Sequence, residues 1–424
     1  MRLVCAPENI DLPAEEGDLR IVLFGQAGAE DRGSAGDAAK NEFLRRRLEA
    51  APRAWDLLSI ALSVVTADYA GIREQSPDGW TREFELEISV SDPVFWNAHA
   101  DDLAKAVEFL TTDRWLFRFH GGGILPAPPK PATRPDADCV VLLSGGLDSL
   151  VGAIDLASSG RRPLAVSQTV RGDAAKQVDF AARIAGGLSH LQLNHNAHAP
   201  GVEDTSQRAR SLIFIAFGVM AATSVGIYHD GGSIDLFLCE SGFIAINPPL
   251  TGARLGSLST RTAHPHYLGS LQRLLDHAGL RVRIRNPYAT ATKGEMLQSC
   301  ADQTFLRSEA ARSTSCGRFQ RFNYRHCGRC IPCHVRRAAF VAWGVPDTTQ
   351  YVYTDLGRDD AEHAGFDDVR SVAMAVGKAA GNGLNDWLGP ALSSPLITNR
   401  AGLEAMISRG LAELQALHKA LGVK

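Results

Sequence analysis

A chain of 424 residues is long enough for two or three domains, each with a core of its own. Its formal net charge of -3 argues against a protein whose main task is to neutralise phosphate backbones, so nucleic acid is not expected as the main ligand. The longest apolar stretch, residues 212–222, is too short to cross a bilayer, and the first ten residues lack the apolar segment of a signal peptide. We therefore expect a cytoplasmic protein with no membrane contact.

Residues 1–125 are predicted to form a small α+β domain. Phe84, Leu86 and Ile88 alternate with glutamates, as in a half-buried strand, and residues 115–119 repeat the alternation with aromatic side chains. Apolar residues at 103, 107 and 110 have helical spacing between these two segments. No catalytic constellation stands out here, so this domain could instead dock a partner protein.

Residues 126–136 are predicted to be a linker, because five prolines within ten residues favour an extended, semi-rigid chain. Residues 137–340 are predicted to form an α/β domain, a parallel sheet with helices on both faces. We expect strands at 139–143, 164–167, 191–193, 234–239 and 281–284, alternating with helices from 148, at 174–185, 207–222 and 265–277, and from 293. Such sheets bind ligands at the carboxyl ends of their strands. Residues 341–424 are predicted to be a helical extension, with an amphipathic stripe over 403–417.

The segment VVLLSGGLDS at residues 140–149 has the pattern of a strand, a small-residue turn and a helix start. Glycine lets a backbone bend sharply and bring its N–H groups against an anion, and a helix N-terminus adds its dipole. The candidate phosphate cradle comprises Ser144, Gly145, Gly146, Leu147, Asp148 and Ser149. A surface turn between a core strand and a helix is the alternative. The Walker A spacing is absent from the chain.

Four cysteines form a separate motif, C-x10-C-x2-C-x2-C, at Cys316, Cys327, Cys330 and Cys333. Two-residue spacers let thiolates converge on one ion, and four soft ligands favour a closed tetrahedral Zn²⁺ site that stabilises the fold. An iron–sulfur cluster is the alternative.

Further candidates lie where the predicted strands end. Lys293 begins a predicted helix and could clamp a phosphate, although Thr292 and Glu295 also form a capping-box pattern there. Glu240 could read the donor edge of a purine-like ring, together with Asn247; a loop held by its own hydrogen bonds is an equal alternative. The other candidates are Arg261 for a carboxylate or phosphate, Arg210 beside the nucleotide or in a surface salt bridge, and Ser167 and Gln168 for adenosine; His264 is expected to cap a helix or to face solvent.

Taken together, SGGLDS, the TKGEM segment at 292–296 and the cysteine motif resemble QueC, the 7-cyano-7-deazaguanine synthase family, over about residues 140–340. The segment RSLIF at 210–214 departs from the family pattern, because Ser211 stands where asparagine is expected. The N-terminal region and the segment CESGFIAINPPL are similar to the QatC group of QueC-like proteins in Qat anti-phage systems.

The resemblance implies a PP-loop fold of the adenine nucleotide alpha hydrolase type and an ATP-dependent C–N ligase. The enzyme would adenylate the carboxylate of 7-carboxy-7-deazaguanine, with Asp148 reaching a Mg²⁺ ion and with Lys293 and Arg261 as further catalytic residues. Ammonia would then displace AMP, or an amine of a partner protein would do so. The alternatives are a tRNA-modifying PP-loop enzyme and a non-catalytic nucleotide-binding subunit of a defence complex.

Overall fold

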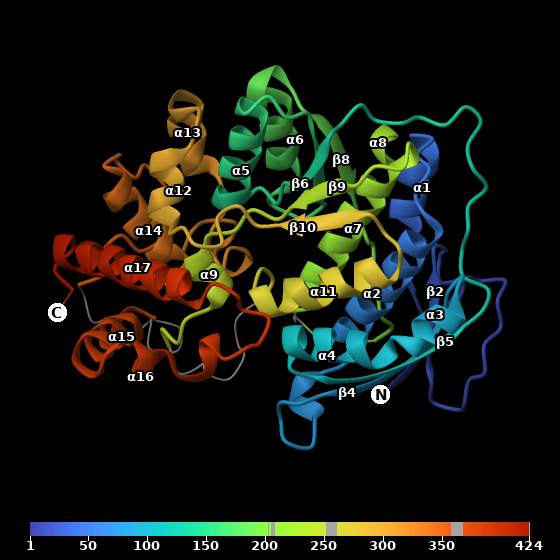
Figure 1. Ribbon diagram of the computed structural model, residues 1–424. Coiled ribbons are helices and arrows are strands. Elements are labelled where there is room, and N and C mark those ends of the chain that lie inside the picture. Colours follow the sequence, from blue (N-terminus) through green and yellow to red (C-terminus); the bar gives the residue numbers. More distant parts are fainter. Residues whose placement is uncertain (202, 205–207, 252–260, 358–367, 424) are drawn as a thin grey trace.

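The computed structural model describes residues 1–201, 203–204, 208–251, 261–357 and 368–423, and these residues form two parallel five-stranded sheets with helices packed on them (Figure 1). The α/β class and the parallel central sheet with helices on both faces are confirmed. None of the helices in these ranges combines the length and the apolar character that a membrane crossing requires.

The N-terminal sheet has the strand order β3-β2-β1-β4-β5. Its elements are β1 (Arg2–Ala6), β2 (Leu19–Leu23), β3 (Arg32–Ala35), α1 (Asp37–Arg45), α2 (Pro52–Ala70), β4 (Glu83–Ser89), α3 (Pro93–Ala98), α4 (Ala100–Thr111) and β5 (Arg114–His120). All four strand pairings are parallel, so the α+β domain expected for residues 1–125 is corrected to α/β. Parallel strands need crossover connections: α4 lies in the one between the neighbours β4 and β5, and α2 lies in the one that leads from the edge strand β3 to β4.

The central sheet has the strand order β10-β9-β6-β7-β8, again wholly parallel. Its elements are β6 (Cys139–Leu142), α5 (Leu147–Ser158), β7 (Pro163–Gln168), α6 (Ala174–Arg183), β8 (Ser189–Leu193), α7 (Arg210–Ser224), α8 (Gly226–His229), β9 (Ile234–Phe237), α9 (Gly242–Ile246), α11 (Pro265–His277), β10 (Val282–Arg285), α12 (Lys293–Ser299), α13 (Gln303–Glu309) and α14 (Ile331–Trp343). Each strand and helix expected between 139 and 299 is therefore present. The buried side chains of β6 point alternately to two cores, Val140 and Leu142 to one and Val141 to the other, as a strand covered on both faces requires.

Helices α2 and α7 lie between the two sheets and pack against each other (Figure 1). One hydrophobic core contains Leu58 and Leu62 of α2, Phe217 of α7 and Val140 of β6. The N-terminal region therefore covers one face of the central sheet, and the core continues from one region into the other. The predicted boundaries at 125, 136 and 340 stay predictions.

The C-terminal region is helical, with α15 (Val369–Asn382), α16 (Leu384–Leu388) and α17 (Arg400–Ala420). The stripe predicted on 403–417 is buried and comprises Leu403, Met406, Ile407, Leu411, Leu414 and Leu417. Helix α17 packs against α9, α12 and α14, on the side of the molecule opposite the N-terminal region (Figure 1).

Candidate active site and metal centre

The SGGLDS segment forms a tight bend between β6 and α5, and hydrogen bonds of its two serine side chains hold the bend together. The hydroxyls of Ser144 and Ser149 are 3.0 Å apart, the Gly146 N–H donates to Ser144 Oγ (3.2 Å), and Ser149 Oγ donates to the Gly146 carbonyl (3.0 Å). Gly145 has φ +86°, a left-handed conformation that favours glycine. Leu147 begins α5 and is buried, so its side chain anchors the bend in the core.

Asp148, in the first turn of α5, brings three separate segments together. Its Oδ1 accepts from the Lys293 ammonium at the start of α12, and its Oδ2 accepts from the Ser241 backbone N–H (3.1 Å), just beyond β9. The Asp148 and Lys293 side chains are only 8% and 7% exposed, so their opposite charges interact in a weakly screened environment. The sequence analysis predicted both residues but not Ser241.

Glu240, next to Ser241, lies at the same edge of the sheet. Burial, and after it the negative charge of Asp148, raises the pKa of its carboxyl to about 7 against the opposing effect of Lys293. Its backbone is fixed by Asn286, whose amide donates to the Glu240 carbonyl (2.9 Å). A carboxyl group in this state can gain or lose a proton near neutral pH.

The capping-box interpretation of the TKGEM segment is confirmed, and the phosphate contact of Lys293 stays a prediction. Thr292 and Glu295 form a full capping box at the start of α12, and this box orients the helix that carries Lys293. Glu413 of α17 adds a second anchor, because its carboxylate accepts from the Thr292 hydroxyl and from the Gly294 N–H (3.3 Å). Nothing in the sequence motif pointed to Glu413.

A second group of polar residues lies against the outer side of the bend. The Thr314 N–H donates to the Gly145 carbonyl (3.0 Å), and its hydroxyl donates to Asp173 (2.6 Å). Lys176 pairs with the same carboxylate at 2.8 Å. The position of Asp173, just after β7, is a signal that sequence reasoning could have used, because ligands of parallel sheets bind beyond the strand ends.

The four cysteines converge as the motif predicts. Their sulfur atoms all lie within 4.8 Å of one another, and the Cys316–Cys330 and Cys327–Cys333 pairs are each 3.8 Å apart. Four thiolates bound at about 2.3 Å in a tetrahedron are about 3.8 Å apart, so the donor set and its spacing fit a Zn²⁺ ion. Cys316 follows Thr314 by two residues, so an ion here would also fix the segment that contacts the Gly145 bend.

Two further candidate residues, Ser167 and Gln168, lie at the end of β7. The Ser167 hydroxyl donates to the Leu143 carbonyl (2.6 Å) and contacts His190 (2.9 Å), and its place beside adenosine stays a prediction. Gln168 is buried, and its Oε1 has no hydrogen-bond partner among the described residues. Gln177 links the bend to this strand end by donating to the Ser144 and Gln168 carbonyls, both at 3.0 Å.

The two candidate arginines, Arg210 and Arg261, have different surroundings. Arg210 is the first residue of α7, which follows β8, so it lies at the carboxyl edge of the sheet where the bend is; burial lowers the pKa of its guanidinium, and the charge of Asp173 opposes this shift. Arg261 donates to the Phe109 carbonyl (3.2 Å) and covers the Phe109 ring at 4.7 Å, so its described contacts are with α4.

Two smaller predictions have structural explanations. Asn247 ends α9 with φ +55°, a conformation that asparagine tolerates. His264 caps α11 through a hydrogen bond from the His266 N–H (3.2 Å), as predicted.

Comparisons with known proteins show what this chain is similar to in sequence. A family model described as "Queuosine biosynthesis protein QueC" matches residues 262–344. The 7-cyano-7-deazaguanine synthase of Cupriavidus taiwanensis is 26% identical over 239 residues, which cover 50% of this chain and 96% of that protein. The proteins of the same name from Rhizobium etli and Agrobacterium fabrum are 27% identical over 260 residues and 29% identical over 246 residues, covering 54% and 51% of this chain and 99% and 93% of theirs. The relatives are thus matched almost end to end, while about half of this chain lies outside the match.

Proposed function

The central part of this chain is QueC-like in sequence, and from this premise we propose that it is an ATP-dependent, adenylate-forming C–N ligase acting on 7-carboxy-7-deazaguanine. A carboxylate oxygen of the substrate attacks the α-phosphorus of ATP, and the bond to pyrophosphate breaks. The amine then attacks the acyl carbon, loses a proton and displaces AMP.

The observation that carries this proposal is the buried Lys293–Asp148 pair at the SGGLDS bend. Adenylation needs positive charge and N–H donors where negative charge accumulates on the α-phosphate and on the departing pyrophosphate. Lys293 and the backbone of residues 144–149 supply both at one place. Lys293 would exchange its contact with Asp148 for phosphate oxygens when ATP binds.

Asp148 is the residue that would hold Mg²⁺, since its carboxylate lies beside the proposed phosphate position and hard cations prefer oxygen ligands. Such an ion would neutralise phosphate charge. The cysteine cluster would hold Zn²⁺ as a structural ion, because its four thiolates leave no ligand position for water.

The deazaguanine substrate and ATP would bind on opposite sides of the Lys293–Asp148 pair. Ionised Glu240 would accept hydrogen bonds from the N–H donors of the deazaguanine ring. Gln168 Oε1, a buried acceptor, would suit the adenine amine. Arg210, on the Asp173 side of the bend, would meet the nucleotide phosphates. Arg261 and Asn247 stay predictions as substrate contacts.

The amine acceptor and the biological setting are also proposals. The acyl-adenylate would react with ammonia, or with the amine of a partner protein that docks in a Qat-type anti-phage system. About half of this chain lies outside the match to typical synthases, and this additional length motivates the second acceptor.

One experiment tests the chemistry and the acceptor together. The full chain is incubated with ATP, Mg²⁺ and 7-carboxy-7-deazaguanine, with either ammonia or candidate partner proteins, and pyrophosphate, AMP and all product masses are measured. We expect pyrophosphate release that depends on the deazaguanine acid and is lost in Lys293→Met. No substrate-dependent pyrophosphate would refute the adenylation chemistry, and unchanged protein masses beside a free amide or nitrile would exclude the protein acceptor.

A further inference from the structure

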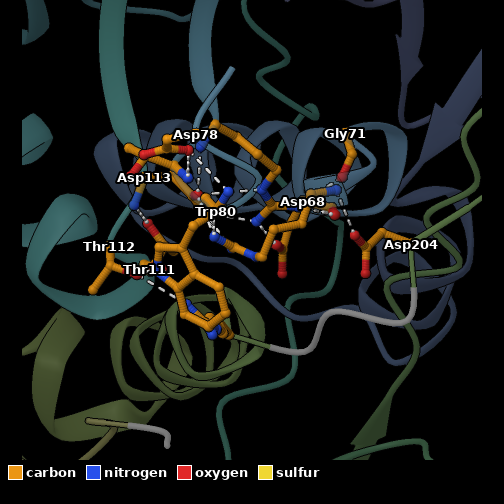
Figure 2. Close-up of polar contacts among 12 residues, drawn as sticks. Asp68, Gly71, Asp78, Trp80, Thr111, Thr112, Asp113 and Asp204 are labelled. Carbon is orange, nitrogen blue, oxygen red and sulfur yellow. Dashed lines mark hydrogen bonds and ion pairs between the residues drawn. The ribbon is translucent and has the colours of Figure 1, made fainter. Parts of the chain in front are cut away.

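A buried ionic network in the N-terminal region joins α2, the segment before β4 and the end of α4 (Figure 2). Asp113 accepts bidentate bonds from Arg73, at 2.9 Å to each oxygen, and also pairs with Arg82 at 2.7 Å. Arg82 donates to Asp68 Oδ1 (2.5 Å) and to the carbonyls of Asp68 and Gly71 (both 2.9 Å). Asp68, Asp113 and Arg82 are at most 4% exposed, so these groups are desolvated and depend on their pairing.

This network continues directly into the start of α7 in the central domain. Arg208 donates to the Thr111 carbonyl (3.0 Å) and to the Thr112 hydroxyl (2.8 Å), and its guanidinium lies 4.8 Å from the centre of the Trp80 ring. The Ala209 N–H donates to Asp68 Oδ2 (3.2 Å). Asp68 therefore uses one carboxylate oxygen for Arg82 and the other for the backbone just before α7.

The rest of the described connection between β8 and α7 is also bonded to the N-terminal region. Ser34 of β3 exchanges two backbone hydrogen bonds with His198, at 3.0 and 2.8 Å, and the Gly36 N–H donates to the His195 carbonyl (2.7 Å). Asp204 accepts from the Arg73 N–H (3.0 Å), and its own N–H donates to the Tyr69 carbonyl (2.7 Å). Three described parts of one connection are thus held by a region that lies elsewhere in the sequence.

This connection leads to Arg210, the first residue of α7. A helix that returns between parallel strands begins at the carboxyl edge of the sheet, so Arg210 lies at the same edge as the Gly145 bend and as Asp173, whose carboxylate holds Thr314 against that bend. Ala209 and Arg208, which the network holds by hydrogen bonds, are the two residues that precede Arg210 in the chain. A shift of the backbone at 208–209 would consequently move the Arg210 guanidinium relative to the bend.

We infer that Asp68 and Arg208 are positioning residues, which hold the first turn of α7 so that Arg210 faces the bound nucleotide. This inference rests on the proposed function for the role of Arg210. It makes the N-terminal region an integral part of the ATP site, in addition to any partner that it binds. Loss of Arg208 removes two charge-assisted hydrogen bonds, so we expect ATP binding to weaken about tenfold or more, as loss of Arg210 itself would do.

A double-mutant cycle in the full chain tests this coupling. The dissociation constant for MgATP is measured for the wild type, Arg208→Ala, Arg210→Ala and the double variant. The expected result is that each single variant binds more weakly and that the double variant is hardly weaker than Arg210→Ala alone, because Arg208 acts through Arg210. Arg208→Lys, which keeps the charge and one donor direction, should recover part of the affinity. Additive losses, or unchanged binding in Arg208→Ala, would overturn the inference.

Two controls separate positioning from general damage. Arg114→Ala removes an exposed ion pair with Glu83 on the same sheet and should leave ATP binding unchanged. Hydrogen exchange in Asp68→Asn should rise at the first turn of α7 and stay constant in β6 and α5; unchanged exchange there would also overturn the inference, even if Arg208→Ala proved too unstable to purify. A wild type that binds ATP but releases no pyrophosphate would refute the proposed function alone, whereas turnover without coupling would refute only this inference.

Discussion

Glu240 gives the sharpest quantitative test of the site. Burial, with Asp148 in addition, raises the pKa of this carboxyl from its ordinary value of 4.5 to about 7. Between these two values the native state binds a proton that the unfolded state has lost, so raising the pH favours unfolding. The contribution of Glu240 to the free energy of unfolding is fully present below pH 4.5 and is lost as the pH passes 7. Integration from pH 5 to pH 8 gives a loss of about 2.5 kcal/mol.

Glu240→Gln removes this titration while keeping the shape and hydrogen-bonding atoms of the side chain. The free energy of unfolding of both proteins is measured by denaturant titration at half-unit steps of pH, and the difference between them is plotted. Relative to the wild type, the variant should gain about 2.5 kcal/mol of stability between pH 5 and pH 8. Curves that stay parallel over this range would refute the raised pKa, and with it the idea that Asp148 and Glu240 share one buried, electrostatically coupled site.

Three further predictions concern the bend, the cysteine cluster and the core behind the bend. Lys293→Met should lower the rate of pyrophosphate release about 100-fold or more while the chain stays folded by circular dichroism, since the lost ammonium acts on developing charge; a rate within about threefold of the wild type would contradict its role. Cys327→Ser should lower bound zinc, measured by mass spectrometry of the metal, and weaken ATP binding because Thr314 loses its support; full metal content would contradict the assigned ligand set. Gly152→Ala should destabilise the fold by about 1–3 kcal/mol in thermal unfolding, because the new Cβ would lie 2.2 Å from the Cys239 sulfur; an unchanged midpoint would mean that α5 shifts freely against β9.

The central domain was predictable because its signals are local. Strands such as β6 and β7 are short runs of buried residues, and helices such as α6 and α11 have an apolar face. The same holds for SGGLDS and the cysteines, where the residues that act together are close in sequence. Lys293 and Asp148 are 145 positions apart, yet both could be assigned to one site from the sequence. Each lies in the first turn of a helix that follows a parallel strand, and these helix starts meet at one edge of the sheet.

Strand pairings and hydrogen bonds between residues far apart in the sequence were not predictable in this way. The parallel arrangement of the N-terminal sheet follows from how β1 pairs with both β2 and β4, and no local pattern encodes that choice. The hydrogen bonds of the Ser167 hydroxyl with Leu143, just after β6, and with His190 of β8 join segments far apart in the sequence, so no local pattern shows them. The bond from Ser241 to Asp148 uses a backbone N–H, a group that every residue but proline carries and that no motif can single out.

Helix α17 in the C-terminal region supports Lys293 at the site, as the N-terminal network supports Arg210. Arg409 and Glu413 are four residues apart on α17 and therefore lie on one face, where Arg409 binds the Glu295 side chain and the Thr290 carbonyl and Glu413 binds Thr292. These contacts enclose the first turn of α12, whose first residue is Lys293. A carboxylate at a helix N-terminus satisfies free N–H groups and interacts favourably with the dipole, so Glu413 stabilises the helix in the orientation that directs Lys293 at Asp148. Lys293 is thus supported from the C-terminal side and Arg210 from the N-terminal side. The orientation of both cationic side chains at the proposed phosphate site therefore depends on regions of the chain that lie beyond the central sheet.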